Sequence, residues 1–420
     1  MPLADTRGSI HANCWVSSNL DSLIPCASWH DQLVVIEPLL TFFECKRTQG
    51  NADMREIAHP ARGRAWGLIA LTLVCTALVW QVPSRRVQAE TAAVTTRLDA
   101  SHVDPLPVSD AEAERTLRTL HTKFRGEEGG KVADHNDIAA AADPKAFGIA
   151  IATVDGRVIS VGDSRVTFPL QSLSKAFVFG LALQDNGNEA MLKNVGVHAT
   201  GFPYGSLAAM EVRATKLQNP MVSAGAIAAT STIAGSNPEE KWDRTLGFLK
   251  AFAGRDVQPM RAVHVAEMAS NNGSLAKAWV LRNYGLLYAE PNATVDRYLH
   301  ACSVGVNTED LAIMGATLAN GGVNPKTNKH VVSAETARGQ LSAMATAGMY
   351  DDSGPWFFRV GIPAKSGVSG GVVAVVPNRF AIAVYSPPLD PYGNSVRASK
   401  VIKALSDLWK LHMLHAATHQ

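Results

Sequence analysis

The chain has 420 residues, of which 46% are hydrophobic and 18% are charged, and its formal net charge is +2. This composition is typical of a globular protein with one large domain or two modest ones, and it leaves little room for extensive disorder. The nearly balanced charge excludes the strongly basic surface of many nucleic-acid-binding proteins, so we expect no nucleic-acid partner.

An apolar run at residues 66–80 follows several arginines and precedes Val87-Gln88-Ala89. A basic flank, a short apolar core and a small residue before the cleavage point are typical of a secretory signal, which we place at 54–89. The signal predicts a secreted or periplasmic protein. A single N-terminal membrane anchor is the second interpretation, since a spanning helix usually needs about 20 apolar residues. A buried core helix is the third.

Residues 1–53 precede this signal, although a signal normally stands at the start of a chain. We therefore expect Met54 to be the real initiator and residues 1–53 to be a mis-assigned or disordered extension. Four of the five cysteines lie before residue 90, so only Cys302 belongs to the later part. We expect Cys302 to be a small buried core residue, and no Cys/His set has the spacing of a zinc site.

Residues 90–110 are polar, contain two prolines, and are predicted to be a linker to a domain at 111–415. A helical pattern follows at 111–124. The apolar runs 147–153 and 157–161 lie on either side of an Asp-Gly pair, which indicates a β-hairpin.

The middle of the chain, about 190–345, is mostly helical. Helix-period apolar residues occur at 225–234, 239–253, 273–284 and 309–319. Strands are predicted again at 357–360, 371–376 and 380–385, before a final helix from about 393 to 412. We therefore predict an α/β fold of the α+β type. One antiparallel sheet is completed by both ends of the domain, and a helical second lobe forms a cleft with it.

Between the hairpin and an apolar helix that ends near Gly187 lies the motif Ser172-Leu173-Ser174-Lys175. At helical spacing, Ser172 and Lys175 leave the same face. A neutral, buried lysine can take the proton of a serine hydroxyl and make it a nucleophile. The S-x-x-K pair is typical of serine acyl-transfer enzymes with a β-lactamase-like fold, although composition alone yields roughly one such pair in a chain of this length.

Three further features offer chemistry, and each has a purely structural alternative. The glycine-rich segment 364–371 precedes a strand, and its N–H groups suit a developing oxyanion; the alternative is a tight turn. Tyr298 and Tyr350 can relay protons, or they are core residues with satisfied hydroxyl groups. Glu267 can bind a substrate ammonium group, or it lies on a helix surface.

In order along the chain, these segments resemble the serine-dependent glutaminases, which show approximately I-Q-S-I-S-K, N-P-M-x-N-A-G-A-I, G-M-Y-D and L-P-A-K-S-G-V-x-G-G. The matching segments here are 170–175, 219–227, 266–267, 298–304, 348–351, 362–371, 386–390 and 393–396. The resemblance runs from about residue 115 to residue 410, with the spacing kept throughout.

The resemblance implies hydrolysis of L-glutamine to L-glutamate and ammonia, without a cofactor and through a Ser-Lys acyl-enzyme. Ser172 is the implied nucleophile and Lys175 is its base. The N–H groups of Ser172 and Val368 are the implied oxyanion donors, and Tyr350 is implied to pass a proton to the departing ammonia. Because the family commonly forms dimers or tetramers, we expect a homo-oligomer.

The resemblance also implies that Tyr298 and Glu267 help to hold the amino-acid end of the substrate. Here the sequence departs from the family, because Ser223 and Ser274 stand at positions where the family has asparagine. Each change removes an amide donor, and a lost hydrogen bond to a charged group costs roughly 1.5–3 kcal/mol.

Two more departures concern the same pocket: Gly205 replaces an asparagine, and His135 replaces a tyrosine that lines the family's pocket. They leave open a second interpretation, a related serine amidohydrolase acting on another small amide. A third is a catalytically silent binding protein that kept the fold. A penicillin-binding protein or β-lactamase is disfavoured, because the motifs follow the glutaminase order.

Overall fold

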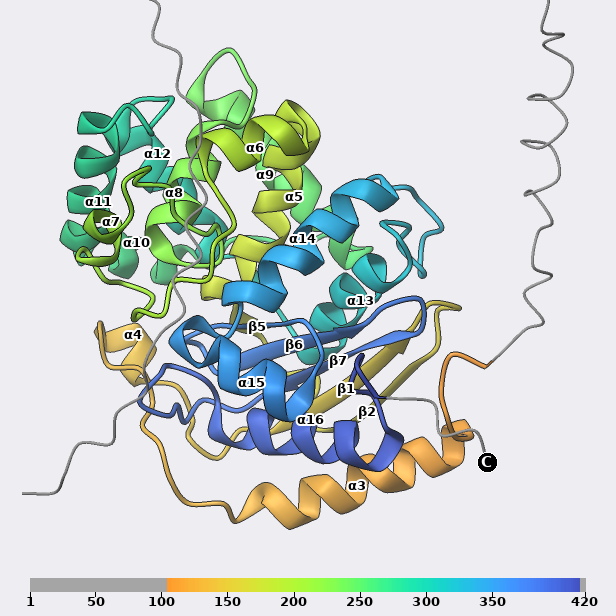
Figure 1. Ribbon diagram of the computed structural model, residues 1–420. Helices are drawn as coiled ribbons and strands as arrows, with labels where there is room; N and C mark the ends of the chain where they lie inside the picture. The colour runs from red at the N-terminus through yellow and green to blue at the C-terminus, as the bar shows by residue number, and fades with distance from the viewer. Residues whose placement is uncertain (1–103, 416–420) are drawn as a thin grey trace, which may run out of the picture. The chain divides into compact units, whose positions relative to one another are not determined.

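The computed structural model describes residues 104–415. Its strands are β1 Gly148–Thr153, β2 Val158–Gly162, β3 Phe168–Pro169, β4 Gly305–Val306, β5 Ala364–Ser366, β6 Gly371–Val376 and β7 Phe380–Tyr385. Five of them form one sheet in the order β2-β1-β7-β6-β5, whose neighbours are all antiparallel (Figure 1). The short strands β3 and β4 pair separately.

Helices occupy most of the remaining described chain. They are α3 Asp110–Arg125, α4 Asp137–Ala140, α5 Ser174–Asn186, α6 Asn188–Asn194, α7 Ala209–Val212, α8 Ser223–Ser231, α9 Pro238–Ala253, α10 Arg261–Ala269, α11 Asn272–Asn283, α12 Pro291–Cys302, α13 Thr308–Ala319, α14 Ala334–Ala347, α15 Ser353–Val360 and α16 Val396–Trp409, with 3-10 turns η1 Gln171–Leu173 and η2 Tyr350–Asp352. The helices predicted at 111–124, 225–234, 239–253, 273–284 and 309–319 are confirmed to within a few residues.

The two ends of the domain meet inside the sheet, as predicted. Strand β1 pairs along its whole length with β7, from Gly148 opposite Tyr385 to Thr153 opposite Phe380. The hairpin between β1 and β2 turns at Gly156, whose φ is 93°, a conformation that glycine adopts without strain. Residues more than 200 positions apart therefore share one backbone ladder, which fixes the N-terminal hairpin against the C-terminal strands.

Alternate residues of the central strands enter two different cores. In β1, Ile149 and Ile151 pack in the core beneath α3 and α16, whereas Ala150 and Ala152 face α13 and the helical lobe (Figure 1). This period of two is the signature of a sheet that is buried on both faces. The small side chains let α13 approach closely, since a Cβ added at Gly315 would lie 2.6 Å from the side chain of Ala381.

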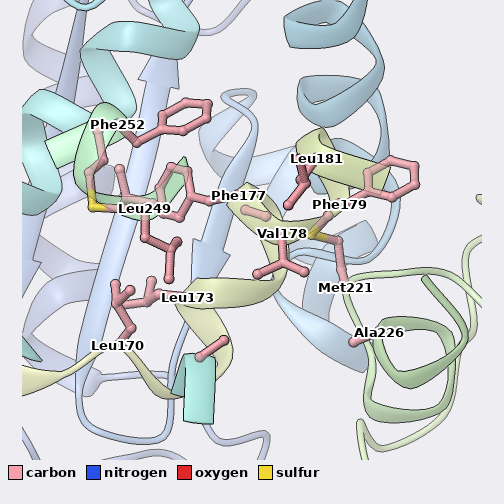
Figure 2. Packing of buried hydrophobic residues seen from close by; sticks show 14 of the residues in the cluster. Leu170, Leu173, Phe177, Val178, Phe179, Leu181, Met221, Ala226, Leu249 and Phe252 are labelled. Atoms are coloured by element: carbon pink, nitrogen blue, oxygen red, sulfur yellow. The ribbon is translucent and has the colours of Figure 1, made fainter. Parts of the chain in front are cut away.

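Helix α5 is the centre of the helical lobe. Every residue from Ser174 to Leu183 is buried, because the helix is enclosed by neighbours on all sides. Figure 2 shows Phe177 and Phe252 on one side of this helix and Phe179 on another; the rings of Phe177 and Phe252 are 5.1 Å apart. Burial on all sides holds the N-terminal end of α5 in a fixed position, and this is the end that carries Lys175.

The strand predicted at 357–360 is wrong, because this segment belongs to helix α15. Trp356 and Val360 are buried at 4% and 2% exposure, whereas Phe358 between them is 86% exposed. Buried residues that are four positions apart, with an exposed residue between them, are typical of a helix with one buried face. The aromatic residues at 357–358 have a high intrinsic preference for strands. The segment is nevertheless helical, because burial of the helix face that carries Trp356 and Val360 outweighs that preference. The last helix ends at Trp409, a few residues earlier than predicted.

The packed domain begins before the predicted boundary at residue 111. Leu106 is only 3% exposed and belongs to the core beneath the sheet, and Arg157 forms ion pairs with Asp104 and Asp110. The predicted extension, signal and start of the linker lie outside the described residues, so that division stays a prediction. Within residues 104–415, no helix has the length and hydrophobicity required to cross a bilayer.

Candidate active site

Ser172 and Lys175 meet where β3 leads into α5. Ser172 lies in the 3-10 turn η1 and Lys175 in the first turn of α5, so their side chains share one face. Lys175 Nζ donates a hydrogen bond of 2.7 Å to Ser172 Oγ. Both side chains are buried, at 3% and 6% exposure. The structure thus brings together the two residues on which the predicted chemistry depends.

Burial determines the charge state of the lysine. Desolvation lowers the pKa of Lys175, and the electrostatic influence of Cys302, Tyr204 and Glu267 opposes that shift only in part. A lower pKa increases the fraction of neutral amine, which is the form that accepts a proton. The Lys175 Nζ also lies 4.9 Å from the centroid of the Tyr298 ring.

Backbone strain occurs at the residue directly before the serine. Gln171 has a φ of 48°, a left-handed conformation that costs a residue with a side chain about 1 kcal/mol. The only other non-glycine residue of the candidate site with such a backbone is Tyr350, at φ 60°. Strain of this kind persists only where surrounding contacts determine the conformation, and here it sets the direction of the Ser172 and Tyr350 side chains.

Tyr350 lies in η2 and is 1% exposed. Its hydroxyl donates a hydrogen bond of 2.9 Å to Ser366 O. Burial raises the pKa of this phenol, and a hydrogen bond with the Ser172 side chain offsets the rise only in part. The phenol therefore keeps its proton at neutral pH and lies next to the serine hydroxyl.

Tyr298, in α12, lies near Ser223 at the beginning of α8. Burial raises the pKa of Tyr298 well above its ordinary value, while hydrogen bonding with Ser223 favours the ionised form. Ser223 is itself buried, at 9% exposure. The structure thus places these two predicted residues together, beside Lys175.

Glu267, in α10, is the carboxylate of this site and is 8% exposed. Its Oε1 accepts hydrogen bonds from His135 Nε2 at 2.8 Å, from Gln171 Nε2 at 2.8 Å and from Asn136 Nδ2 at 3.1 Å. Burial favours the protonated carboxyl group, but these donors outweigh it, and the pKa of Glu267 is lowered. Glu267 is therefore an ionised, buried anion and not a helix-surface carboxylate.

The backbone N–H groups of Ser172 and Val368 have no acceptor within residues 104–415. Gly367 brings the strand edge that carries Val368 against the turn of Ser172. A Cβ at Gly367 would lie 3.1 Å from Leu170 O and 3.3 Å from Leu173 N. Two free N–H groups on closely packed segments can hold a developing oxyanion.

Two cavities lie beside this site, although neither is lined by Ser172 or Lys175. One of about 250 Å³ is mostly apolar and reaches Gln171 and Glu267; the other, of about 580 Å³, reaches Tyr204. Val368 and His135 line both. The two cavities therefore share walls from the segment before α4 and from the strand edge at Val368.

Ser274 lies in the first turn of α11 and is half-buried, whereas Ser223 is buried. The Ser274 side chain makes no hydrogen bond to a described residue. Its contact with a substrate stays a prediction. Within the same described range, no group of three His, Cys, Asp or Glu side chains is placed to hold a metal ion.

Four residues of the site were not predicted as site residues: Gln171, Asn136, Tyr204 and Lys365. Gln171 and Asn136 bind Glu267, the Tyr204 ring lies 4.8 Å from that of Tyr350, and Lys365 Nζ lies 4.1 Å from the Tyr350 centroid. Gln171 and Lys365 lie within segments that the sequence analysis names, and Asn136 and Tyr204 are adjacent to His135 and Gly205. Their side-chain directions depend on contacts between distant segments, which periodicity does not reveal.

Comparisons with known proteins identify the family of this chain. The sequence matches the family described as Glutaminase over residues 130–414. It is 41% identical to the glutaminase of Mycobacterium ulcerans (strain Agy99) over 311 residues, which cover 74% of this chain and 97% of that protein. It is 43% identical to the glutaminase of Microcystis aeruginosa (strain NIES-843 / IAM M-2473) over 301 residues, which cover 72% and 89%.

The chain belongs to the glutaminase family. Solved structures of similar proteins support the same family and fold. A probable glutaminase, ybaS, is 39% identical with a TM-score of 0.72, and the match covers 74% of this chain and 100% of that one. The structure of Mglu in its glutamate form is 37% identical with a TM-score of 0.69, over 73% and 70% of the two chains. The predicted family and β-lactamase-like fold are confirmed, and this glutaminase is an amidohydrolase.

Proposed function

We propose that this glutaminase hydrolyses L-glutamine to L-glutamate and ammonia with Ser172 as nucleophile and Lys175 as base. The observation that carries the proposal is the buried 2.7 Å contact between Lys175 Nζ and Ser172 Oγ. A neutral amine at that distance can accept the hydroxyl proton as the oxygen attacks, because proton transfer needs hydrogen-bonding reach.

In the acylation step, Ser172 Oγ forms a bond to the side-chain amide carbon and its proton moves to Lys175 Nζ. The amide oxygen becomes negative and accepts hydrogen bonds from the N–H groups of Ser172 and Val368. These donors have no other acceptor within the described chain, so they are available when the charge develops. Removal of one such donor typically costs about 3 kcal/mol of barrier.

Collapse of the tetrahedral intermediate breaks the carbon–nitrogen bond. The departing nitrogen takes a proton from the Tyr350 hydroxyl and leaves as ammonia, and the phenolate regains a proton from Lys175. The raised pKa of Tyr350 supports this role, because the phenol is protonated before the step. Water then attacks the acyl-enzyme, Lys175 accepts its proton, and Ser172 regains its hydrogen as L-glutamate is released.

The substrate's α-ammonium group pairs with Glu267 in this proposal. An ionised, buried carboxylate in the wall of the 250 Å³ cavity suits a cation. Tyr298 and Ser223, beside Lys175, contact the amino-acid end, and we retain Ser274 as a further contact. A related small amide is the second candidate substrate, because serine replaces asparagine at two of these positions.

The cellular location and assembly are also proposals. The apolar run at 66–80 and its basic flank support a secreted or periplasmic enzyme, with a single membrane anchor as the alternative. N-terminal sequencing of the native protein tests this, since a first residue near 90 supports cleavage and one within 1–53 contradicts initiation at Met54. A homo-oligomer, dimer or tetramer, is expected, and sedimentation velocity measures it.

The function is tested with wild type and Ser172→Ala in an ammonia-release assay over glutamine, asparagine and a few other amides. We expect glutamine turnover in the wild type and a loss of at least about 1,000-fold in the variant. Mass spectrometry with a glutamine-like electrophile should detect an adduct on Ser172. Turnover of another amide without turnover of glutamine would favour the second candidate, and absence of any adduct or turnover would indicate a silent binding protein.

A further inference from the structure

We propose that His135 is a specificity-determining residue that competes with the α-ammonium group of the substrate for the Glu267 carboxylate. The inference rests on the proposed role of Glu267 in holding that ammonium group. It adds that the affinity for an amino-acid substrate depends on whether His135 is protonated, whereas the affinity for an analogue without the ammonium group does not.

His135 and the substrate's α-ammonium group must share the single negative charge of Glu267. Glu267 is the only carboxylate that hydrogen-bonds the Ser172 turn within residues 104–415, through Gln171. His135 Nε2 already lies 2.8 Å from its Oε1. When His135 is protonated, the carboxylate is neutralised and a second cation gains little from it. When His135 is neutral, the full charge is available to the substrate.

His135 can move away from Glu267, whereas the other two hydrogen-bond donors, Gln171 and Asn136, are held in place. Gln171 is buried and has a strained backbone, and Asn136 uses its side-chain oxygen to cap α4 through Ala139 N at 2.9 Å. The His135 side chain is 39% exposed and has Glu267 as its hydrogen-bond partner. It lies on the irregular segment before α4 and lines both cavities, so its ring can turn toward solvent.

The charges around His135 favour the protonated ring. The hydrogen bond to Glu267 raises its pKa above the ordinary value, and burial opposes this rise. Asp134, on the same segment, acts in the same direction as Glu267. The other titratable groups that line the two cavities or interact with Glu267 are Lys131, Asp143, Lys175, Tyr204, Tyr298, Cys302, Tyr385 and Asp390. None of them forms an ion pair with His135, so Glu267 dominates its titration within the described chain.

The preference of the site for ligands with an α-ammonium group therefore depends on pH. Below the raised pKa of His135, binding of an amino acid must displace a proton or separate an ion pair. Above that pKa, neither cost applies. Affinity for a ligand with an α-ammonium group therefore increases as the pH rises through the His135 pKa, and ligand binding below that pKa releases a proton.

The test compares two competitive inhibitors, L-glutamate and glutarate, which differ only in the α-ammonium group. Their inhibition constants are measured from pH 5.5 to 8.5 for wild type, His135→Gln and the control His330→Gln, an exposed histidine outside the site. The ratio of the two constants cancels titrations that affect both ligands equally. Thermal melts check that the variants fold.

In the wild type we expect the preference for L-glutamate over glutarate to increase about tenfold from pH 6 to pH 8.5. His135→Gln should show the high preference at every pH, and His330→Gln should match the wild type. A wild-type ratio that is independent of pH would overturn the inference. So would a His135→Gln variant with a lower preference at every pH, because His135 would then support Glu267 and not compete for it.

The variant Glu267→Gln separates this inference from the function on which it rests. If Glu267→Gln does not change the preference for L-glutamate, Glu267 does not hold the ammonium group, and the proposed substrate contact fails together with the inference. If Glu267→Gln abolishes the preference while His135→Gln retains the wild-type pH profile, the contact stands and only the role of His135 is wrong.

Discussion

Lys365 Nζ lies 4.1 Å from the centroid of the Tyr350 ring, and the lysine has no exposed surface. Its hydrogen bonds go to two main-chain carbonyls, Gly348 O and Ser366 O. No carboxylate pairs with it in the described chain. Burial lowers the pKa of Lys365 well below its ordinary value, and nearby Lys175 lowers it further. The catalytic tyrosine of our proposal thus packs against a second lysine with weakened proton affinity.

The pH dependence of stability should reveal this lysine. A lysine that is neutral when folded but protonated when unfolded destabilises the fold at any pH below its unfolded pKa, which is about 10.4. The unfolding free energy of the wild type should therefore rise from the lowered pKa up to that value, by up to about 1.4 kcal/mol per pH unit for each such lysine. Lys365→Met should reduce the slope in urea titrations between pH 7 and pH 9.5.

The exposed Lys329→Met serves as the control for this experiment and should leave the slope unchanged. Lys175 has a pKa shifted in the same direction, so part of the wild-type slope should remain in Lys365→Met. Identical slopes in Lys365→Met and wild type would mean that Lys365 stays protonated in the folded protein.

Tyr350→Phe tests proton delivery to the departing ammonia. The change keeps the ring against Tyr204 and Lys365 and removes only the hydroxyl group. We expect kcat for glutamine to fall by about 100-fold or more, with a much smaller change in KM, because the lost group acts in the transition state. Tyr392→Phe, at a 47% exposed tyrosine, should retain wild-type kinetics. A wild-type kcat in Tyr350→Phe would remove this tyrosine from the mechanism.

Gly367→Ala tests whether close contact between the strand edge and the serine turn is required. The added methyl group would lie 3.0 Å from Leu173 Cγ and 3.1 Å from Leu170 O, so the strand edge and the serine turn must separate by a few tenths of an ångström. We expect kcat to fall by at least about tenfold, since the Ser172 and Val368 donors separate. At Gly247, in α9, an added Cβ meets no atom within 4 Å, so Gly247→Ala should retain activity and stabilise the helix by about 0.5–1 kcal/mol. Equal activity of both variants would contradict the proposed oxyanion site.

Restoring asparagine at the two serine positions tests the substrate contacts. Ser223→Asn should lower KM for glutamine by about tenfold or more, because the residue is buried beside Tyr298 and an amide adds a donor there. Ser274→Asn should have a smaller effect, since this residue is only half-buried and its side chain makes no hydrogen bond within the described chain. Steady-state kinetics of the two single variants and the double variant measure both. An unchanged KM in all three would show that these positions do not limit glutamine binding.

Prediction from the sequence worked best where a local pattern and the tertiary contacts agree. The hairpin between β1 and β2, helix α13 and the S-x-x-K turn each have a period or spacing that matches their final environment. The strand predicted at 357–360 is wrong because its aromatic residues favour a strand, while helix α15 buries a single face that includes Trp356 and Val360. Propensity is a local preference of about 1 kcal/mol, and packing of large side chains outweighs it.

The sequence by itself determined most of the order of the elements, the Ser172 and Lys175 pair and the family, because these depend on residue types and on spacing along the chain. Only the tertiary structure decided that Glu267 is an ionised, buried anion with His135 bound to it, and that Lys365 lies against Tyr350. The first contact joins residues that are far apart in the sequence. In the second, the direction of the Lys365 side chain is set by the sheet to which β5 belongs. The charge state of a side chain depends on its burial and on the charged and hydrogen-bonding groups near it in space. A pattern of residues along the sequence specifies neither.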